Sequence, residues 1–449
     1  FLLQDRPNKN QHFFTSWKHE NRRKICVKIT FLLVLLFILE GALRKWVLPS
    51  FATPLTLLRD PFAIILYIFA AIFGLMYAGR IARLWLIFAF LTACLAALQY
   101  IQSGHGVIGW ALGVRTYWLY LPLAFVVAKS FSLWDAERLL RLVILLAIPY
   151  SALILLQYNA APDAFINLGV AGDEDAAVRL NRHVVRPFGT FAYTKINVQY
   201  TAFTLAAVIS YFLMPKYKPV SKITFFISCA ATAAMVVLTG SREIFFLCAC
   251  ILLVSILGSC IFGPTRAALR FLALLSVLSA LLALGVIFFF PDMLNAMLIR
   301  LEAAAAAEGG IWNRIYYSGF SFIGGFWHAT VLGYGMGAGA PGVSSLLDLP
   351  RFFLGEADTQ RNVRELGIVF GAAILVLRWY TSLWLVFRSL RLAKRGIYFT
   401  APLAGYALLP LSISRLTNSP QDAFLTWLSV GLFLAIWIRR PLDRSSGPN

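Results

Sequence analysis

The stretch Ile223–Phe262, ITFFISCAATAAMVVLTGSREIFFLCACILLVSILGSCIF, consists of two apolar runs with only Ser241-Arg242-Glu243 between them. Each run is long enough to cross the roughly 30 Å hydrocarbon core of a bilayer as a helix. An ionisable side chain inside hydrocarbon is costly, so a charged turn of this kind belongs at a membrane surface or in a polar site. The stretch therefore predicts a helical hairpin in a membrane, with a candidate functional site at its turn.

The composition of the whole chain agrees with this interpretation. The 449 residues are 60% apolar and 13% charged, with a mean hydropathy of +0.75, whereas about a quarter of residues are charged in soluble domains. Apolar windows of sufficient length lie near residues 27–43, 61–78, 84–101, 107–128, 140–158, 196–214, 223–239, 244–262, 271–290, 366–387, 397–414 and 423–438. The sequence predicts an all-α polytopic membrane protein with about 12 transmembrane helices, several of them short or interrupted.

Lysine and arginine residues set the expected orientation, because they concentrate in cytoplasmic connections. The N-terminal stretch is basic, and so is every second connection after it. We expect both termini in the cytoplasm, with a segment over 1–26, a single membrane domain over 27–438 and a tail over 439–449. This topology and contact with anionic membrane lipids explain most of the net charge of +20, so no nucleic-acid partner is expected.

The remaining connections then face outward, and two of them are long, at about 159–195 and 291–365. All six cysteines fall within or beside the predicted spans, so neither loop has a disulfide framework or the ligand spacing of a metal site. We expect chemistry at the outer surface to take place in these two loops, with no metal ion and no cofactor.

The first long loop contains three arginines, Arg179, Arg182 and Arg186. Arginine suits phosphate because its planar fork donates two parallel hydrogen bonds and keeps its charge at any relevant pH. Arg179 and Arg182 can instead pair with acidic residues just upstream or extend to lipid phosphates. Arg186 precedes the rigid Pro187 and the permissive Gly189, which indicates a constrained loop entering the membrane. We expect Arg186 to meet a phosphate at headgroup depth.

Arg242 is the second predicted phosphate-binding arginine. The turn that carries it has only a few residues, which leaves Arg242 little freedom at the outer end of two helices. Glu243 beside it can instead neutralise its charge. Thr239, Gly240 and Ser241 are small residues that permit close helix packing or the approach of a ligand to the backbone.

The second long loop contains His328 and the glycine-rich stretch 333–339. Glycines let backbone amides approach an anion, but the lysine and Ser/Thr of a phosphate-binding P-loop are missing, which favours a re-entrant or interfacial turn. The aromatic residues between 312 and 327 suit either an interfacial belt or platforms for sugar rings. His328 is a candidate substrate-binding residue, although a lone histidine at an interface more often has a structural hydrogen bond.

The end of the second loop supplies two carboxylates and a further arginine. If this stretch is helical, Glu356 and Glu365 are about two and a half turns apart and lie on roughly one face. A carboxylate here can take a proton from a hydroxyl group. Arg361 lies between the two and is another candidate for binding an anionic substrate.

Several of these motifs resemble, in order and topology, the bacterial O-antigen ligase and O-antigen (Wzy-type) polysaccharide polymerase superfamily. They are Arg186-Pro-Phe-Gly-Thr-Phe, Thr239-Gly-Ser-Arg242, Arg314 before Gly333-Tyr-Gly-Met-Gly, and Glu365-Leu-Gly367. The stretch Glu40-Gly-Ala-Leu-Arg44 with Arg59-Asp60-Pro after it is similar to polymerase-like members. The resemblance implies a GT-C-like glycosyltransferase of the bacterial inner membrane, with two long periplasmic loops and an active site facing the periplasm.

The resemblance also implies roles for individual residues. Arg186 and Arg242 match arginines that hold the pyrophosphate of an undecaprenyl-linked sugar donor, and Arg314 matches a basic position in the large loop. An acceptor hydroxyl would attack the donor anomeric carbon while the two arginines stabilise the leaving pyrophosphate without a metal ion. The implied partners are an undecaprenyl-pyrophosphate-linked glycan, membrane lipids, and chain-length regulator or export proteins of a polysaccharide pathway.

One departure from the family pattern bears on the reaction. Ligases carry a histidine shortly before the Glu-Leu-Gly turn, whereas this chain has Glu356 and Asp358 there. The departure favours polymerisation of repeat units for O-antigen, capsule or exopolysaccharide over ligation onto lipid A core, with Glu356 as the general base. The predicted site residues are Glu356, Arg242 and Arg186 for catalysis, and Arg186, Arg242, Arg314, Arg182, Arg361 and His328 for substrate binding.

Two other classes of function stay open. A transporter or flippase of lipid-linked sugars would also need outer arginines, but it should have charged or broken helices near the midplane. Within the predicted spans the candidates are Arg115, Arg378 and, near one end, Glu40. A non-catalytic envelope assembly protein would not require Arg186, Arg242 and Glu356 together.

Overall fold

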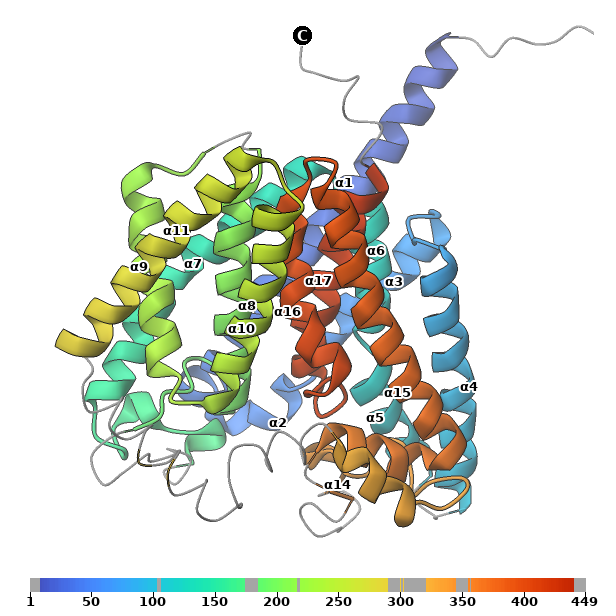
Figure 1. Ribbon diagram of the computed structural model, residues 1–449. Helices are drawn as coiled ribbons and strands as arrows, with labels where there is room; N and C mark the ends of the chain where they lie inside the picture. The colour runs from blue at the N-terminus through green and yellow to red at the C-terminus, as the bar shows by residue number, and fades with distance from the viewer. Residues whose placement is uncertain are drawn as a thin grey trace, which may run out of the picture.

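The computed structural model describes residues 9–102, 106–173, 185–215, 219–289, 299, 302, 320–344, 354–355 and 357–439. Every regular element that these residues form is a helix (Figure 1). The longer helices are α1 (Lys9–Ala42), α3 (Asp60–Ile72), α4 (Arg80–Gln102), α5 (Gly106–Trp118), α6 (Leu121–Ser130), α7 (Leu133–Asn159), α8 (Thr194–Leu213), α9 (Lys222–Leu238), α10 (Arg242–Ile256), α11 (Thr265–Leu284), α15 (Asp358–Ala393), α16 (Ala401–Ser412) and α17 (Pro420–Arg439). Short helical elements are η1 (Leu43–Val47), η2 (Pro49–Phe51), α2 (Ala52–Leu55), η3 (Phe165–Asn167), η4 (Val170–Gly172), η6 (Leu257–Ile261), η7 (Gly285–Phe289), α14 (Pro341–Ser344) and η8 (Tyr398–Thr400).

Many of these helices have the length and composition of membrane spans. In the described part of the chain, nine helices qualify, and the pair α5 and α6, bent by 44°, makes a tenth. The expectation of a helical protein with several membrane-length helices is therefore confirmed. Each apolar window of the sequence coincides with a helix or, for 107–128, with the pair α5 and α6. Two of these helices are too short to qualify as spans, because α9 has 17 residues and α16 only 12. They account for the difference between the ten spans found among the described residues and the 12 expected.

α8 lies at the centre of the bundle. Its most apolar window is 94% buried, and it contacts α7, α9, α10, α11, α16 and α17. The corresponding windows of α11 and α4 are only 22% and 33% buried, and both helices lie at the edges (Figure 1). Asn197 and Gln199 on α8 are at most 2% exposed, so their polar groups need partners inside the protein.

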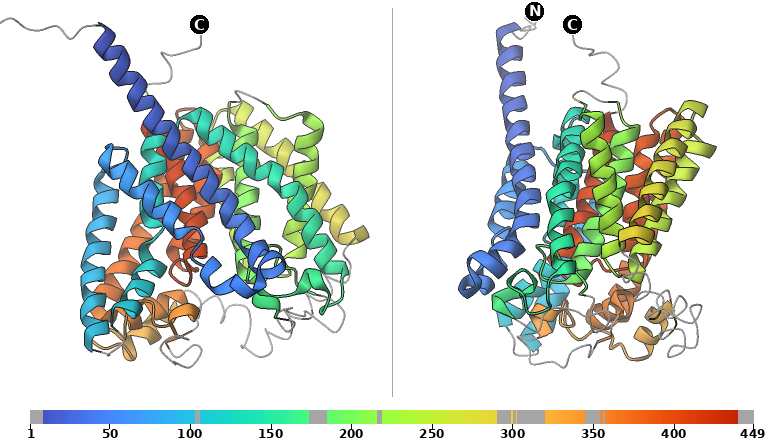
Figure 2. Two further views of the ribbon diagram at one scale, coloured as in Figure 1. Left: turned by 180° about the vertical axis from the view of Figure 1, so that it is seen from behind. Right: turned by 90° about the vertical axis from the view of Figure 1, so that its left-hand side faces the viewer.

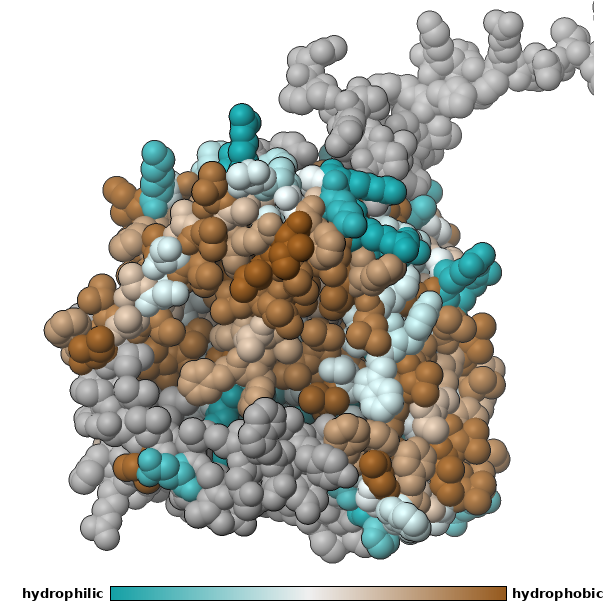
Figure 3. All heavy atoms as spheres, viewed as in Figure 1, coloured by the Kyte–Doolittle hydropathy of each residue, from teal (hydrophilic) through white to brown (hydrophobic). Residues whose placement is uncertain are grey.

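On the face shown in Figure 3, the middle of the described surface is apolar. α4 alone exposes Leu84, Ile87, Phe90, Leu98 and Ile101. An apolar surface this extensive is unusual on a soluble monomer and is expected where a protein contacts lipid. The all-helical core and the apolar belt together are consistent with a multi-pass membrane protein.

The bundle has two different ends. At the first, which we call the basic end, α1 and α4 begin and α6, α15 and α17 end (Figures 1 and 2). Hydrophilic residues gather there (Figure 3). At the opposite end, which we call the site end, α8, α10, α15 and α17 begin. The predicted arginines of the described part, Arg186, Arg242 and Arg361, precede or begin these helices or lie in their first turn, so they belong to the site end.

Buried charges on α15 hold the connection between α16 and α17 in place. Arg378 is completely buried and donates to Asp358 Oδ2 at 2.7 Å and to the Ser414 carbonyl oxygen at 2.6 Å. Asp358 Oδ2 also accepts from the backbone N–H of Leu416 at 3.2 Å. A buried charge is tolerated when it is paired and hydrogen-bonded, as both of these are. The loop over 413–419 is therefore fixed against the start of α15.

Replacing Arg378 with leucine should destabilise the protein strongly. The variant leaves Asp358 buried without its main counter-charge, and removing one partner of a buried pair costs about 3–5 kcal/mol. The measurement is thermal melting of the purified protein in detergent, followed by size-exclusion chromatography. Arg83→Leu, at an exposed position near the start of α4, is the matched control. Equal melting temperatures for the two variants would contradict this account of the ion pair.

Candidate functional site

Arg186 lies in the loop that leads into α8. Its side chain is half-buried, and Nε donates a hydrogen bond to the carbonyl oxygen of Thr239 at 2.8 Å. Thr239 directly follows α9 and precedes Arg242 by three positions. Segments far apart in the sequence therefore bring the two predicted phosphate-binding arginines to the same part of the site end.

Buried amide side chains fix the backbone of this loop. Asn197 Nδ2 on α8 donates to the Pro187 carbonyl oxygen at 3.0 Å, and the Tyr150 hydroxyl donates to Asn197 Oδ1 at 2.8 Å. Gln157 at the end of α7 donates to the Gly189 carbonyl oxygen at 3.1 Å and accepts from the Gly189 N–H at 2.7 Å. Gly189 has a φ of 60°, a conformation that glycine adopts readily. The loop is constrained, as Pro187 and Gly189 predict.

The end of α1 and the start of η1 pack against the same loop. Lys45 is 1% exposed, and its Nζ donates to the Gly189 carbonyl oxygen at 2.9 Å and lies 3.7 Å from the centre of the Phe188 ring. A Cβ on Gly41 would overlap the carbonyl oxygen of Thr190, so only glycine allows this approach. The two motifs around Glu40 and Arg186 thus contact each other directly.

Arg242 is the first residue of α10 and is half-buried. Ser241 caps the helix, and its Oγ accepts from the Glu243 N–H at 3.3 Å. Glu243 Oε1 accepts from Gln199 Nε2 on α8 at 3.0 Å and from the Ser414 hydroxyl at 2.7 Å. The glutamate therefore links the start of α10 to the central helix and to the 413–419 loop.

The 413–419 loop brings a further arginine, Arg415, to this place. It is half-buried, and within the described residues its guanidinium has no hydrogen-bond or ion-pair partner. Its charge acts on Asp422, which is 3% exposed and accepts from the Ser419 hydroxyl at 2.9 Å. Arg415 is not among the site residues predicted from the sequence. The sequence did contain a signal, because Ser414-Arg415 lies in a short connection between two helices, as Ser241-Arg242 does.

The glycine-rich stretch 333–339 wraps around a kink in α15 at Gly367, where φ is 78°. The Gly337 N–H donates to Glu365 Oε2 at 3.1 Å, and the Gly339 N–H donates to Glu365 Oε1 at 2.8 Å. The Tyr117 hydroxyl also donates to this fully buried carboxylate. The amides of the glycine run do approach an anion, and in the described structure that anion is the chain's own Glu365.

Arg361 is part of the interior network rather than an open site. It is 3% exposed, and its guanidinium contacts Asp358 at 2.6 Å and Glu365 at 3.1 Å. Its Nη1 donates to Asn418 Oδ1 at 2.7 Å. These contacts join the first turns of α15 to the 413–419 loop, so the geometry favours a structural role for Arg361.

The other predicted site residues are less informative. Glu356, Arg314 and Arg182 lie outside the described residues. His328 is exposed just after a helical segment over 320–327. No contact among the described residues joins His328 to the loop of Arg186 or to the turn of Arg242.

Two of the charged residues considered for a transport pathway, Arg115 and Glu40, are paired with residues at or next to the start of α3. Arg115 on α5 forms an ion pair with Asp60, the first residue of α3. Glu40 on α1 forms ion pairs with Arg59 and, at 3.3 Å, with Arg44. Arg59 and Glu40 are each 1% exposed, so these pairs stabilise helix contacts in the interior.

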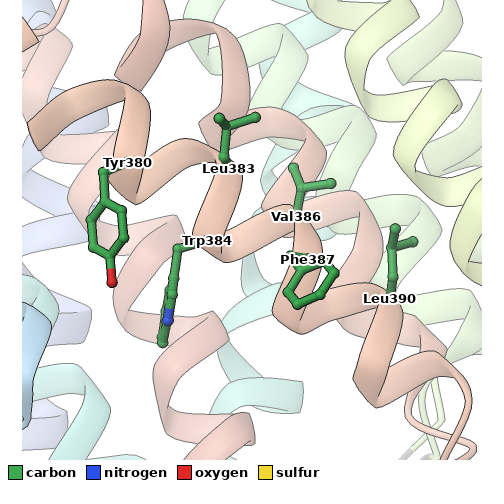
Figure 4. A pocket seen from close by; sticks show the side chains of 6 residues that line it. All are labelled: Tyr380, Leu383, Trp384, Val386, Phe387 and Leu390. Atoms are coloured by element: carbon green, nitrogen blue, oxygen red, sulfur yellow. The ribbon is translucent and has the colours of Figure 1, made fainter. Parts of the chain in front are cut away.

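A hollow of about 470 Å³ on the outward face of α15 has no role in this site (Figure 4). Its lining comes from a single helix and is almost wholly apolar, without a group that recognises phosphate. It belongs to the apolar belt. The lining residues are Tyr380, Leu383, Trp384, Val386, Phe387 and Leu390.

Comparisons with models of known protein families and with curated proteins find no match to this chain. The evidence for the site is therefore the contacts among the loop of Arg186, the start of α10 and the 413–419 loop, together with the motifs in the sequence.

Replacing Gly41 with alanine should disturb the loop that carries Arg186. The new Cβ overlaps the Thr190 carbonyl oxygen, and overpacking of this kind typically costs about 1–3 kcal/mol. Thermal melting in detergent measures the loss. Gly285→Ala is the matched control, because a Cβ there meets nothing within 4 Å. An unchanged melting temperature for Gly41→Ala would mean that the close approach of α1 to this loop is wrong.

Proposed function

We propose that this chain is a metal-independent membrane glycosyltransferase that polymerises undecaprenyl-pyrophosphate-linked oligosaccharide repeats at the periplasmic face of a bacterial inner membrane. In this proposal about 12 helices cross the membrane, both termini are cytoplasmic and the site end faces the periplasm. The observation that carries the proposal is the hydrogen bond from Arg186 to the Thr239 carbonyl oxygen, which joins the loop of Arg186 to the turn of Arg242.

The electrostatics of the site end suit a diphosphate. Arg186 and Arg242 each offer a planar fork that can donate two parallel hydrogen bonds to phosphate oxygens. Arg242 also begins α10, so the positive end of the helix dipole adds to its charge. Donors held in place before the reaction stabilise charge that develops on the leaving pyrophosphate.

The proposed reaction transfers one glycan to another. A hydroxyl of the acceptor sugar attacks the anomeric carbon of the donor, the bond from that carbon to the pyrophosphate oxygen breaks, and undecaprenyl pyrophosphate leaves. The hydroxyl proton passes to a general base. The growing glycan then passes to export proteins or a chain-length regulator of the same pathway.

Glu356 remains the proposed base. The two carboxylates that replace the histidine of ligases are Glu356 and Asp358. Asp358 is buried and already accepts hydrogen bonds from Arg361 and Arg378, so it is not available to a sugar hydroxyl. This engagement favours Glu356 within the pair. The replacement of the ligase histidine by these carboxylates favours polymerisation over ligation onto lipid A core.

A transporter or flippase of lipid-linked sugars is the second candidate. The interior charges that would line such a pathway are committed to pairs, namely Arg115 with Asp60, Glu40 with Arg59 and Arg378 with Asp358. Transport along them would require breaking these pairs at several kcal/mol each. An envelope assembly protein without catalysis is the third candidate, and it predicts that single arginine variants keep full function.

Arg242→Ala should abolish polymer formation while the protein level stays normal. Losing one preorganised contact to the transition state costs on the order of 3 kcal/mol, or more than a hundredfold in rate. Arg242→Lys should also fail substantially, since lysine is a point charge without the bidentate fork. Polymer length and yield, read on a gel of extracted polysaccharide, measure the effect, with Arg83→Ala as control. Near-normal polymer from Arg242→Ala would argue strongly against the enzyme.

Chelation of divalent metal ions should leave the reaction intact. In the proposed mechanism the arginines alone neutralise the leaving pyrophosphate. Purified protein is given a lipid-pyrophosphate-linked oligosaccharide with excess EDTA, and chain extension is followed by mass spectrometry. A strict dependence on added divalent metal would refute a mechanism that relies on arginines alone.

A further inference from the structure

We propose that Arg415 is a third anion-binding arginine of this site, and that it contacts the pyrophosphate group from the 413–419 loop. The inference rests on the proposed function, because it assigns a residue to the same ligand. Its support comes from three properties of the loop: its position, the rigidity of its backbone and the state of its charges.

The position follows from Ser414. Its hydroxyl donates to Glu243 Oε1 at 2.7 Å, and Glu243 is the neighbour of Arg242. Arg415 is the next residue after Ser414, so its backbone lies beside the start of α10. Arg186, which precedes α10 in the chain, contacts the same turn through its hydrogen bond to the Thr239 carbonyl oxygen.

The backbone on both sides of Arg415 is fixed. Before it, the Ser414 carbonyl oxygen accepts from Arg378 at 2.6 Å. After it, the N–H groups of Leu416 and Thr417 donate to Asp358 at 3.2 Å and 3.4 Å. A donor on a backbone held in this way is preorganised, so little ordering is needed when an anion binds.

The guanidinium of Arg415 differs from those of the interior arginines in its pairing. Arg59, Arg115 and Arg361 are all held in ion pairs with carboxylates. Arg415 is half-buried, and no hydrogen bond or ion pair joins its guanidinium to any described residue. A partly desolvated cation without a partner is stabilised by an anion from outside, and a diphosphate supplies more than one negative charge.

Nearby carboxylates offer a competing explanation. Glu243 accepts hydrogen bonds from Gln199 and Ser414 through Oε1, and no ion pair joins it to Arg415 in the described structure. Asp422 accepts from the Ser419 hydroxyl at 2.9 Å, but its Oδ1 has no hydrogen-bond partner among the described groups. Arg415 would then serve only to balance the buried charge of Asp422, and the experiment must separate this role from ligand binding.

The experiment measures the affinity of the full-length protein for farnesyl pyrophosphate, a soluble polyprenyl pyrophosphate, by calorimetry in phosphatidylcholine nanodiscs. Losing a charge-assisted contact should raise the Kd of Arg415→Ala roughly tenfold to a hundredfold. Arg415→Lys should recover only part of the affinity, since it lacks the fork. Arg83→Ala, at the basic end, should bind as the wild type does. If Arg415→Ala has a lower melting temperature than the wild type, the affinity of the folded Arg415→Lys variant is used instead. A wild-type Kd for Arg415→Lys would then overturn the proposal.

Several results would overturn the inference, and they differ in what else they affect. If the wild type binds farnesyl pyrophosphate and Arg415→Ala binds it equally well, the inference fails while the proposed function stands. If the wild type does not bind it, both fail. Recovery of wild-type affinity in the double variant Arg415→Gln with Asp422→Asn would show that Arg415 only balances Asp422. In a separate measurement, the purified wild type and Arg415→Ala are compared for the phosphatidylglycerol that they retain in detergent. Less phosphatidylglycerol on Arg415→Ala, with unchanged binding of farnesyl pyrophosphate, would assign Arg415 to phospholipid headgroups instead.

Discussion

Two amide side chains on the central helix hold the site end together. Asn197 donates to the carbonyl oxygen of Pro187, and Gln199 donates to Glu243. Residues two positions apart on a helix point about 200° apart, so α8 stands between the loop of Arg186 and the start of α10. Both amides are buried and must be satisfied within the protein, because burying an amide without a partner is costly. The relative placement of the two arginine segments depends on this requirement.

Buried charges on α15 form a scaffold that positions two neighbouring segments. In the scaffold, Asp358, Arg361, Arg378 and Glu365 satisfy one another together with backbone groups of the glycine run and of the 413–419 loop. Such a network does not by itself make a protein more stable than an apolar core would, but it defines one arrangement of α15, the glycine run and the 413–419 loop. The arrangement it defines is the one that places Ser414 beside Glu243.

The sequence was informative wherever a pattern was local. Apolar windows predicted the helices, and Pro187 with Gly189 predicted a constrained loop. The contact between the glycine run and Glu365 joins distant parts of the chain, so it was not readable from the sequence. The pair of Arg361 with Glu365 lies within α15 at a spacing of four residues, so the sequence did contain that signal. Whether a distant segment such as the glycine run meets an internal carboxylate depends on helix packing, which no single segment encodes. The Ser-Arg pair in the short connection before α17 pointed to Arg415, but the sequence does not show that this loop reaches the start of α10.

The scaffold also explains how residues without ligand contact can govern the site. Arg378 binds the carbonyl oxygens of Ser414 and Pro410, and Asp358 binds the N–H of Leu416, so one ion pair sets the backbone of the whole 413–419 loop. Ser414 then holds Glu243. A change to Arg378 should therefore shift the 413–419 loop first and the start of α10 through that loop. The interior charges of α15 are thus connected to the start of α10 through the 413–419 loop, at the end of the bundle where the site arginines lie.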